Sequence, residues 1–210
     1  MIEGGAIVRS VLPGTTIETK LTDKDVAKTF LDNIFMTGGL MLSQVVSLTG
    51  IEPYVIQNWV KRGFLPRPEK KLYTKNQFCR VAIISALRES MQIDRITSLL
   101  SYINGHLDDE RDDLVSDAEL YNDFVNLIIA CGGFRSPREI RIVIDELTAD
   151  YKEPYAGARK RLSRVLEVML YAYTAAEFRL TAENLMADFD CANRRRLTAV
   201  KYMKGRLNSE

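Results

Sequence analysis

Glycine and proline divide one stretch near the N-terminal end into short segments, and this division constrains the fold most strongly. Leu42–Leu48 has the composition of a short helix, and Gly50 breaks it. Pro53 suits the first position of a second short helix, which ends at Gly63. The two prolines in Phe64–Pro68 exclude a helix there, because proline restricts the residue before it. The sequence therefore predicts two short consecutive helices followed by a non-helical connection.

Helical periodicity extends over most of the remaining chain, and it predicts a mainly α fold. Thr74 is placed to cap one helix, and Ser136, Pro137 and Glu139 combine a capping box with proline at the first helical position. The connection that runs from Phe64 to Tyr73 is expected to form a small two-stranded wing. The further helices are expected at about residues 22–37, 75–87, 93–104, 114–130, 137–151 and 154–189.

Charge changes sign along the 210 residues, although the whole chain carries a net charge of only +1. Residues 40–90 hold eight basic and three acidic side chains, and residues 106–123 hold eight acidic and one basic. We therefore place a domain boundary near residue 105. The expected parts are a flexible N-terminal arm (1–24), a first domain (25–105) and a helical domain for dimerisation or effector binding (106–210).

The usual components of enzyme and metal sites are scarce. The chain has one histidine and three widely spaced cysteines, with no phosphate-binding loop and no nucleophile–base pair in a known motif. We expect no catalytic residues, no metal and no cofactor. No uncharged run is apolar enough to cross a membrane, and residues 1–10 lack the pattern of a secretory signal. The expected location is the cytoplasm, without a membrane partner.

The second short helix carries polar side chains between its apolar positions, as a helix that faces a DNA groove does. Glutamine and asparagine suit the edges of bases, and lysine and arginine suit phosphates. Trp59 is expected in the core, because it shares the apolar spacing of its neighbours. Tyr73 either contacts the DNA backbone through its hydroxyl or packs within the wing. The candidate DNA-binding residues are Tyr54, Gln57, Asn58, Lys61, Arg62, Arg67, Lys70, Lys71 and Tyr73.

Several motifs in order resemble the winged helix-turn-helix of MerR-type regulators. They are Leu42–Val45, Thr49–Ile51, Trp59–Pro66 and Lys71–Tyr73, followed by Met91–Ile96. Ile56–Phe64, Leu100–Gly105 and the segment from Asp108 to Tyr121 resemble more closely an uncharacterised bacterial family of MerR-like proteins, catalogued as a domain of unknown function. The resemblance implies a winged helix-turn-helix, DNA binding and a dimer.

The expected function is that of a transcriptional regulator that binds double-stranded DNA as a homodimer, with a small-molecule effector as a further partner. Residues 53–62 are expected in the major groove, and residues 64–73 on the phosphates. MerR recognition helices usually carry an arginine, then aromatic residues and then an acidic residue. Here those positions hold Gln57, Asn58, Trp59 and Val60, so the arginine is absent. That departure supports an alternative, a protein-interaction adaptor that uses the C-terminal helices. A sensor with a pocket near Tyr171, Tyr173 and Phe178 is the third possibility.

Overall fold

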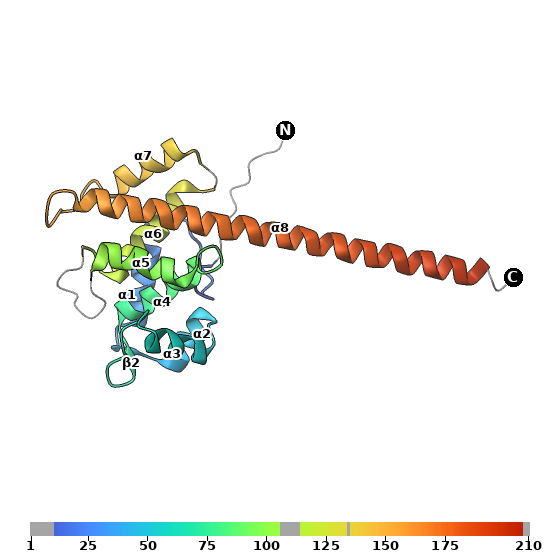
Figure 1. The fold of residues 1–210 in the computed structure, drawn as a ribbon, viewed down its shortest axis with the longest axis horizontal. Helices are drawn as coiled ribbons and strands as arrows, with labels where there is room; N and C mark the ends of the chain where they lie inside the picture. Colours follow the sequence, from blue (N-terminus) through green and yellow to red (C-terminus); the bar gives the residue numbers. More distant parts are fainter. Residues whose placement is uncertain (1–10, 106–113, 134, 208–210) are drawn as a thin grey trace. The chain divides into compact units, whose positions relative to one another are not determined.

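The computed structural model describes residues 11–105, 114–133 and 135–207, with side chains as far as residue 187 and at Phe189. Its described part is mainly helical (Figure 1), as the periodicity predicts. Two short strands, β1 (Leu40–Met41) and β2 (Leu72–Tyr73), form a small sheet. The helices are α1 (Val26–Ile34), α2 (Leu42–Thr49), α3 (Pro53–Lys61), α4 (Lys75–Leu87), α5 (Ile93–Asn104), α6 (Asp117–Cys131), α7 (Pro137–Leu147) and α8 (Ala158–Leu207).

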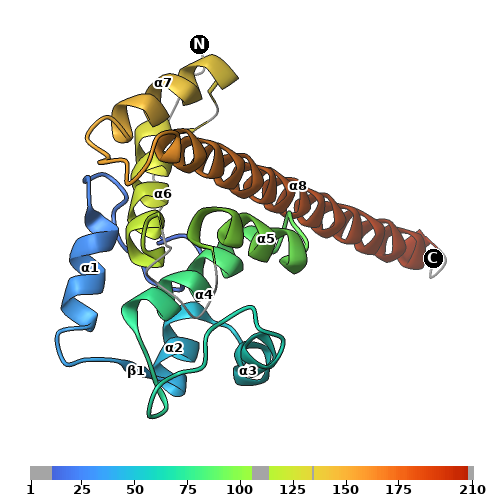
Figure 2. The ribbon, with the colours of Figure 1, turned by 60° about the vertical axis from the view of Figure 1, so that its left-hand side comes forward.

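The chain forms two compact units, residues 1–173 and 174–210, and the division between them falls within α8. Helix α4 runs through the core of the first unit, and ten of its thirteen residues are buried. Helices α2, α5 and α6 pack around α4, and α6 also contacts α1 and α7 (Figure 2). The first residues of α8, with Leu162, Val165 and Leu166 fully buried, complete this core.

The two short helices predicted from the glycine and proline pattern are present, and Gly50 makes the turn between them. Gly50 has a φ of +67°, and its N–H donates to the carbonyl of Val46 at 2.8 Å, which closes α2. Pro53 occupies the first turn of α3, as expected. Ile56 and Trp59 are buried, so one face of α3 faces the core and the other is left to solvent.

The strand pairing in the structure differs from that of the expected wing. Strand β2 pairs antiparallel with β1, which precedes α2, and Leu40 lies opposite Tyr73. Phe64 and Leu65 do not form the second strand, because their side chains are buried in the core, and Pro66 and Pro68 lack the N–H groups that a strand needs. The chain between α3 and β2 is therefore a loop that ends in a tight turn. We call this loop together with β2 (residues 64–73) the hairpin.

Helix α6 belongs to the same core as the helices before it. The side-chain amides of Asn122 and Asn126 donate to the carboxylate of Asp25 at 2.8 and 2.9 Å. Phe124 of α6 meets Tyr173 of α8 edge to face, with 5.7 Å between ring centroids. The first compact unit therefore extends beyond the boundary expected at residue 105. None of the helices described combines the length and apolar composition needed to cross a membrane.

Candidate nucleic-acid interface

One face of α3 presents four of the nine candidate residues to solvent. Tyr54, Gln57, Asn58 and Lys61 follow at spacings of three, one and three residues, which places them on one side of a helix. All four are exposed, and the side chain of Tyr54 reaches 70% exposure. Trp59 is 5% exposed, which confirms its expected place in the core. The solvent face of α3 is therefore polar, aromatic and basic.

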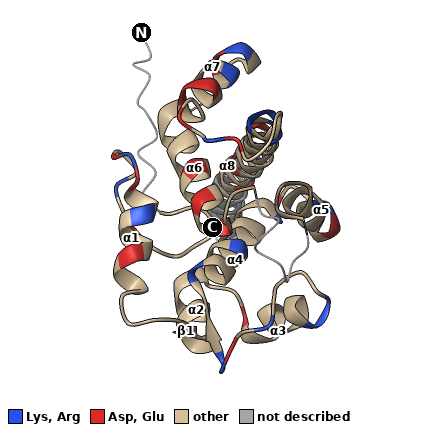
Figure 3. Cartoon of the chain, turned by 90° about the vertical axis from the view of Figure 1, so that its left-hand side faces the viewer, with Lys and Arg blue, Asp and Glu red and all other residues tan. Residues whose placement is uncertain are grey.

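Four candidate cations stand at the end of α3 and on the hairpin without an acidic partner. Lys61, Arg67, Lys70 and Lys71 are exposed, and none of them makes an ion pair with any residue that the structure describes. In Figure 3 the ribbon is blue, the colour of lysine and arginine, at the end of α3 and at the tip of the connection to α4. Such groups are available to phosphates.

Arg62 differs from these four, because it already contacts an acidic side chain and an aromatic ring. Its guanidinium lies 3.6 Å from the carboxylate of Asp94 and stacks on the ring of Phe64, 4.4 Å from the centroid. Both side chains of the ion pair are about half exposed or more, so the pair is weak and open to competition by a phosphate.

The tip of the hairpin is a tight turn with an unusual backbone. The N–H of Leu72 donates to the carbonyl of Glu69 at 2.8 Å, and the two residues between them are Lys70 and Lys71. Their φ angles are +49° and +67°. Hairpin turns with positive φ at both central residues usually carry Asn-Gly, because a side chain is strained in that conformation.

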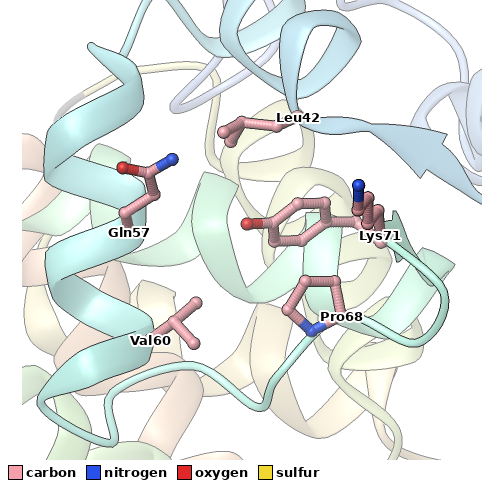
Figure 4. A pocket seen from close by; sticks show the side chains of 6 residues that line it. Leu42, Gln57, Val60, Pro68 and Lys71 are labelled. Atoms are coloured by element: carbon pink, nitrogen blue, oxygen red, sulfur yellow. The ribbon is translucent and has the colours of Figure 1, made fainter.

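A hollow of about 340 Å³ separates α3 from the hairpin, and we call it the slot (Figure 4). Gln57 and Val60 reach it from α3, and Lys71 and Pro68 reach it from the hairpin. The structure thus brings together a residue expected to read bases and a residue expected to contact a phosphate. The full lining of the slot is Leu42, Gln57, Val60, Pro68, Lys71 and Tyr73.

Tyr73 is the only candidate residue that is buried. Its side chain is 3% exposed, and this burial raises the pKa of its hydroxyl. Tyr73 therefore packs within the core, and contact of its hydroxyl with the DNA backbone stays a prediction. The hydroxyl finds no hydrogen-bond partner among the residues described, although Tyr73 lines the slot.

A buried ion pair that the sequence does not predict lies next to the start of the hairpin. The Arg80 guanidinium donates to Asp117 at 3.0 Å, and its Nε donates to the carbonyl of Phe64 at 3.1 Å. Asn104 donates to the same carboxylate at 3.2 Å. Arg80, Asn104 and Asp117 are each no more than 7% exposed. The group therefore joins the start of the hairpin to α4, the end of α5 and the start of α6.

The acidic stretch that follows α5 has more than one role. Residues 106–113 lie outside the described residues. Ser116 caps α6 through a hydrogen bond from the N–H of Glu119, as expected of a capping residue. Asp117 is instead the buried partner of Arg80. Within the described ranges, no cluster of histidine, cysteine, aspartate and glutamate is placed to hold a metal ion.

Comparison with known proteins identifies a domain of unknown function, DUF1836, over residues 29–124. This span contains the exposed face of α3, the hairpin, the slot and the Arg80–Asp117 pair. It confirms the resemblance to an uncharacterised domain family, while the MerR-type part of that resemblance stays a prediction. No curated protein and no solved structure matches the chain.

Proposed function

We propose that this protein is a transcriptional regulator that binds double-stranded DNA through α3 and the hairpin. The observation that carries this proposal is the arrangement around the slot. Gln57, with donors and acceptors suited to a base edge, stands across it from Lys71, which is suited to a phosphate. A DNA duplex that approaches this face meets both kinds of contact at once.

In this proposal, α2 and α3 act as a helix-turn-helix and the hairpin acts as the wing of a MerR-type domain. Tyr54, Gln57 and Asn58 of α3 enter the major groove and contact the edges of bases, and Lys61 at the end of α3 contacts a phosphate. The unpaired cations of the hairpin contact the flanking phosphates. Arg62 joins them when a phosphate displaces Asp94. Tyr73 holds β2 in place, and its role is positioning rather than contact with bases.

The second compact unit supports a homodimer. Phe178, Leu185 and Phe189 follow at spacings of seven and four residues, which places them along one side of α8. Their side chains are 55%, 56% and 62% exposed. Aligned apolar side chains of this size mark an interaction surface, because leaving them in water is unfavourable. We assign this surface to a second copy of the chain.

Charge along the same helix supports pairing of two copies in opposite directions. Residues 174–190 contain four acidic side chains and one basic, and residues 191–207 contain six basic and no acidic. Two antiparallel copies bring the acidic segment of each beside the basic segment of the other. A dimer presents two copies of α3, and paired half-sites in the DNA follow from its symmetry.

A protein-interaction adaptor is the second candidate, and the same apolar side of α8 favours it. In that role Phe178, Leu185 and Phe189 dock on a different protein, and α3 has no duplex to read. An effector pocket near Tyr171, Tyr173 and Phe178 has less support. Tyr173 is packed against Phe124, and the side chains of Tyr171 and Phe178 are exposed.

The experiment that tests DNA binding is fluorescence anisotropy with random duplex DNA over a range of salt concentrations. In the test variant, Lys61, Arg67, Lys70 and Lys71 are changed to alanine. In the matched control, four other exposed cations (Lys20, Lys24, Arg138 and Lys152) are changed to alanine. The slope of log Kd against log salt should fall by about 3 to 4 in the test variant, because each lost phosphate contact removes about 0.9. The control should keep the wild-type slope. Absence of binding at low salt supports the adaptor instead.

A further inference from the structure

The chemistry of the slot is that of a small-molecule site, in addition to its place on the proposed DNA face. Leu42, Val60 and Pro68 give it apolar walls, and Lys71 is the only charged residue in its lining. Its volume of about 340 Å³ lies at the lower end of the range for ligand pockets. A guest of matching chemistry therefore has a small apolar body.

The polar groups around the slot are free to bind such a guest. The hydroxyl of Tyr73 has no hydrogen-bond partner among the described residues, and it is not among their buried unpartnered atoms, because Tyr73 lines the slot. The side chains of Gln57 and Lys71 are likewise without a hydrogen bond or ion pair in the described parts of the chain. A lysine, a tyrosine and an amide together offer donors and one positive charge, so the complementary group is an anion that accepts hydrogen bonds.

We propose that the slot binds a small amphipathic carboxylate, of the size of an aromatic acid or a short fatty acid. The apolar body lies against Leu42, Val60 and Pro68, and the carboxylate accepts hydrogen bonds from Lys71 and Tyr73. An inorganic anion alone leaves the apolar walls unused. The apolar walls therefore favour an organic acid over free phosphate.

The backbone of the turn supports this assignment. Lys71 has a φ of +67°, which lies in the left-handed region that is unfavourable for a residue with a side chain. Strain of this kind persists where the surroundings hold it, and it is common at ligand-binding sites. Of the two residues of this turn with positive φ, Lys71 supplies the charged group of the slot.

A consequence for regulation follows, and it depends on the proposed DNA-binding function. A carboxylate in the slot occupies space between α3 and the hairpin, and its negative charge neutralises Lys71. Both effects weaken the binding of phosphates. The effector then acts directly on the DNA-binding face rather than through the C-terminal helices.

The test is a titration of the full-length protein, without DNA, followed by chemical shifts of the backbone amides. The probes are benzoate, phenylacetate and hexanoate, with benzyl alcohol, hexanol and inorganic phosphate as controls. We expect the carboxylates to bind with a Kd of the order of 1 mM, as suits ligands of so few atoms. Shifts should centre on residues 42, 57, 60, 71 and 73. The alcohols should bind about tenfold more weakly, since they lack the charge-assisted bond.

Two neighbouring lysines provide a matched pair of variants. Lys71→Met should weaken benzoate binding about tenfold, and Lys70→Met should change it less than twofold, because Lys70 lies outside the slot lining. Tyr73→Phe keeps the ring that packs in the core and should weaken binding about threefold. Equal effects of the two lysine variants, equal binding of alcohols and acids, phosphate binding as tight as benzoate, or no shifts at all overturns the proposal.

A second arm separates this proposal from the proposed function. If DNA binding is observed, saturating benzoate should raise the Kd for random duplex about tenfold, and the Lys71→Met protein should need about tenfold more benzoate for its own response. Unchanged DNA affinity with a filled slot contradicts the regulatory consequence. Failure of DNA binding itself leaves the titration without DNA as an independent test of the slot.

Discussion

Lys70 and Lys71 adopt a backbone conformation that is unfavourable for any residue with a side chain. Replacing Lys70 with glycine removes this strain, and Lys70 makes no ion pair among the described residues that would be lost. Lys70→Gly is therefore expected to raise the free energy of unfolding by about 0.5–1 kcal/mol, after the extra entropy of glycine in the unfolded chain is counted. Urea denaturation measures the change. A loss of stability contradicts the strained turn.

The Asp123 carboxyl makes the stability of the fold depend on pH. Burial raises its pKa to about 6, and the carboxylates of Glu119 and Asp25 add to the shift. In the unfolded chain the pKa returns to 3.8. Below about pH 4 the carboxyl is therefore protonated in both states, and it does not lower the free energy of unfolding. Between pH 4 and 6 the cost of ionising it in the folded state grows, and above pH 6 it is fully present.

Asp123→Asn should remove this cost. The variant is expected to be more stable than the wild type by roughly 2 kcal/mol at pH 7.5, with the difference shrinking towards zero near pH 4. Urea denaturation at several pH values measures it. Asp150→Asn, at an exposed position, serves as the control and should show no such trend. A difference that is the same at every pH refutes the role given to Asp123.

Single residues differ in how well the sequence predicts their exposure, backbone conformation and partners. The polar face of α3 is predictable, because helical periodicity separates Gln57 and Lys61 from Ile56 and Trp59. The positive φ of Lys70 and Lys71 is not, because lysine carries no preference for that conformation. The pairing of Arg80 with Asp117 is also hidden, since 37 residues separate them. The only local sign of this pair in the sequence is an arginine within the apolar run of α4.

Among the elements, the Arg80–Asp117 pair connects the hairpin with α4, α5 and α6. Arg80→Met leaves the Asp117 carboxylate buried without its charged partner and leaves the carbonyl of Phe64 without a donor. We expect a loss of about 3–5 kcal/mol in the free energy of unfolding, measured by urea denaturation. Arg80→Met combined with Asp117→Leu should recover a large part of the loss, because no charge is then left buried. A double variant no more stable than Arg80→Met argues against this account.

Helices and strands show the same contrast between local and distant information. Gly50 marks the end of α2, and Pro53, Thr74 and Ser136 mark the starts of α3, α4 and α7, as the sequence predicts. The pairing of β2 with β1 is not predictable. Each strand has two residues, too few for an alternating pattern, and about 30 residues separate them.

For the whole molecule, the apolar side of α8 predicts a dimer of twice the 23.9 kDa chain mass in light scattering. Changing both Leu185 and Phe189 to glutamate should convert it to a monomer, because charges are unfavourable in an apolar interface. Asn184→Glu, at an exposed neighbouring position, should leave the dimer intact. If the two copies run antiparallel, Glu177→Lys with Glu183→Lys should also weaken it. A wild-type monomer at high concentration contradicts the assignment of this surface to a second copy.

Selection of bound sequences from a random duplex pool tests whether two copies of α3 read DNA. We expect enrichment of an inverted repeat with two equal half-sites. The variant with Gln57→Ala and Asn58→Ala should lose base preference while it keeps salt-dependent binding, because its phosphate contacts remain. A pool that stays random after selection with the wild-type protein contradicts the reading of DNA by α3.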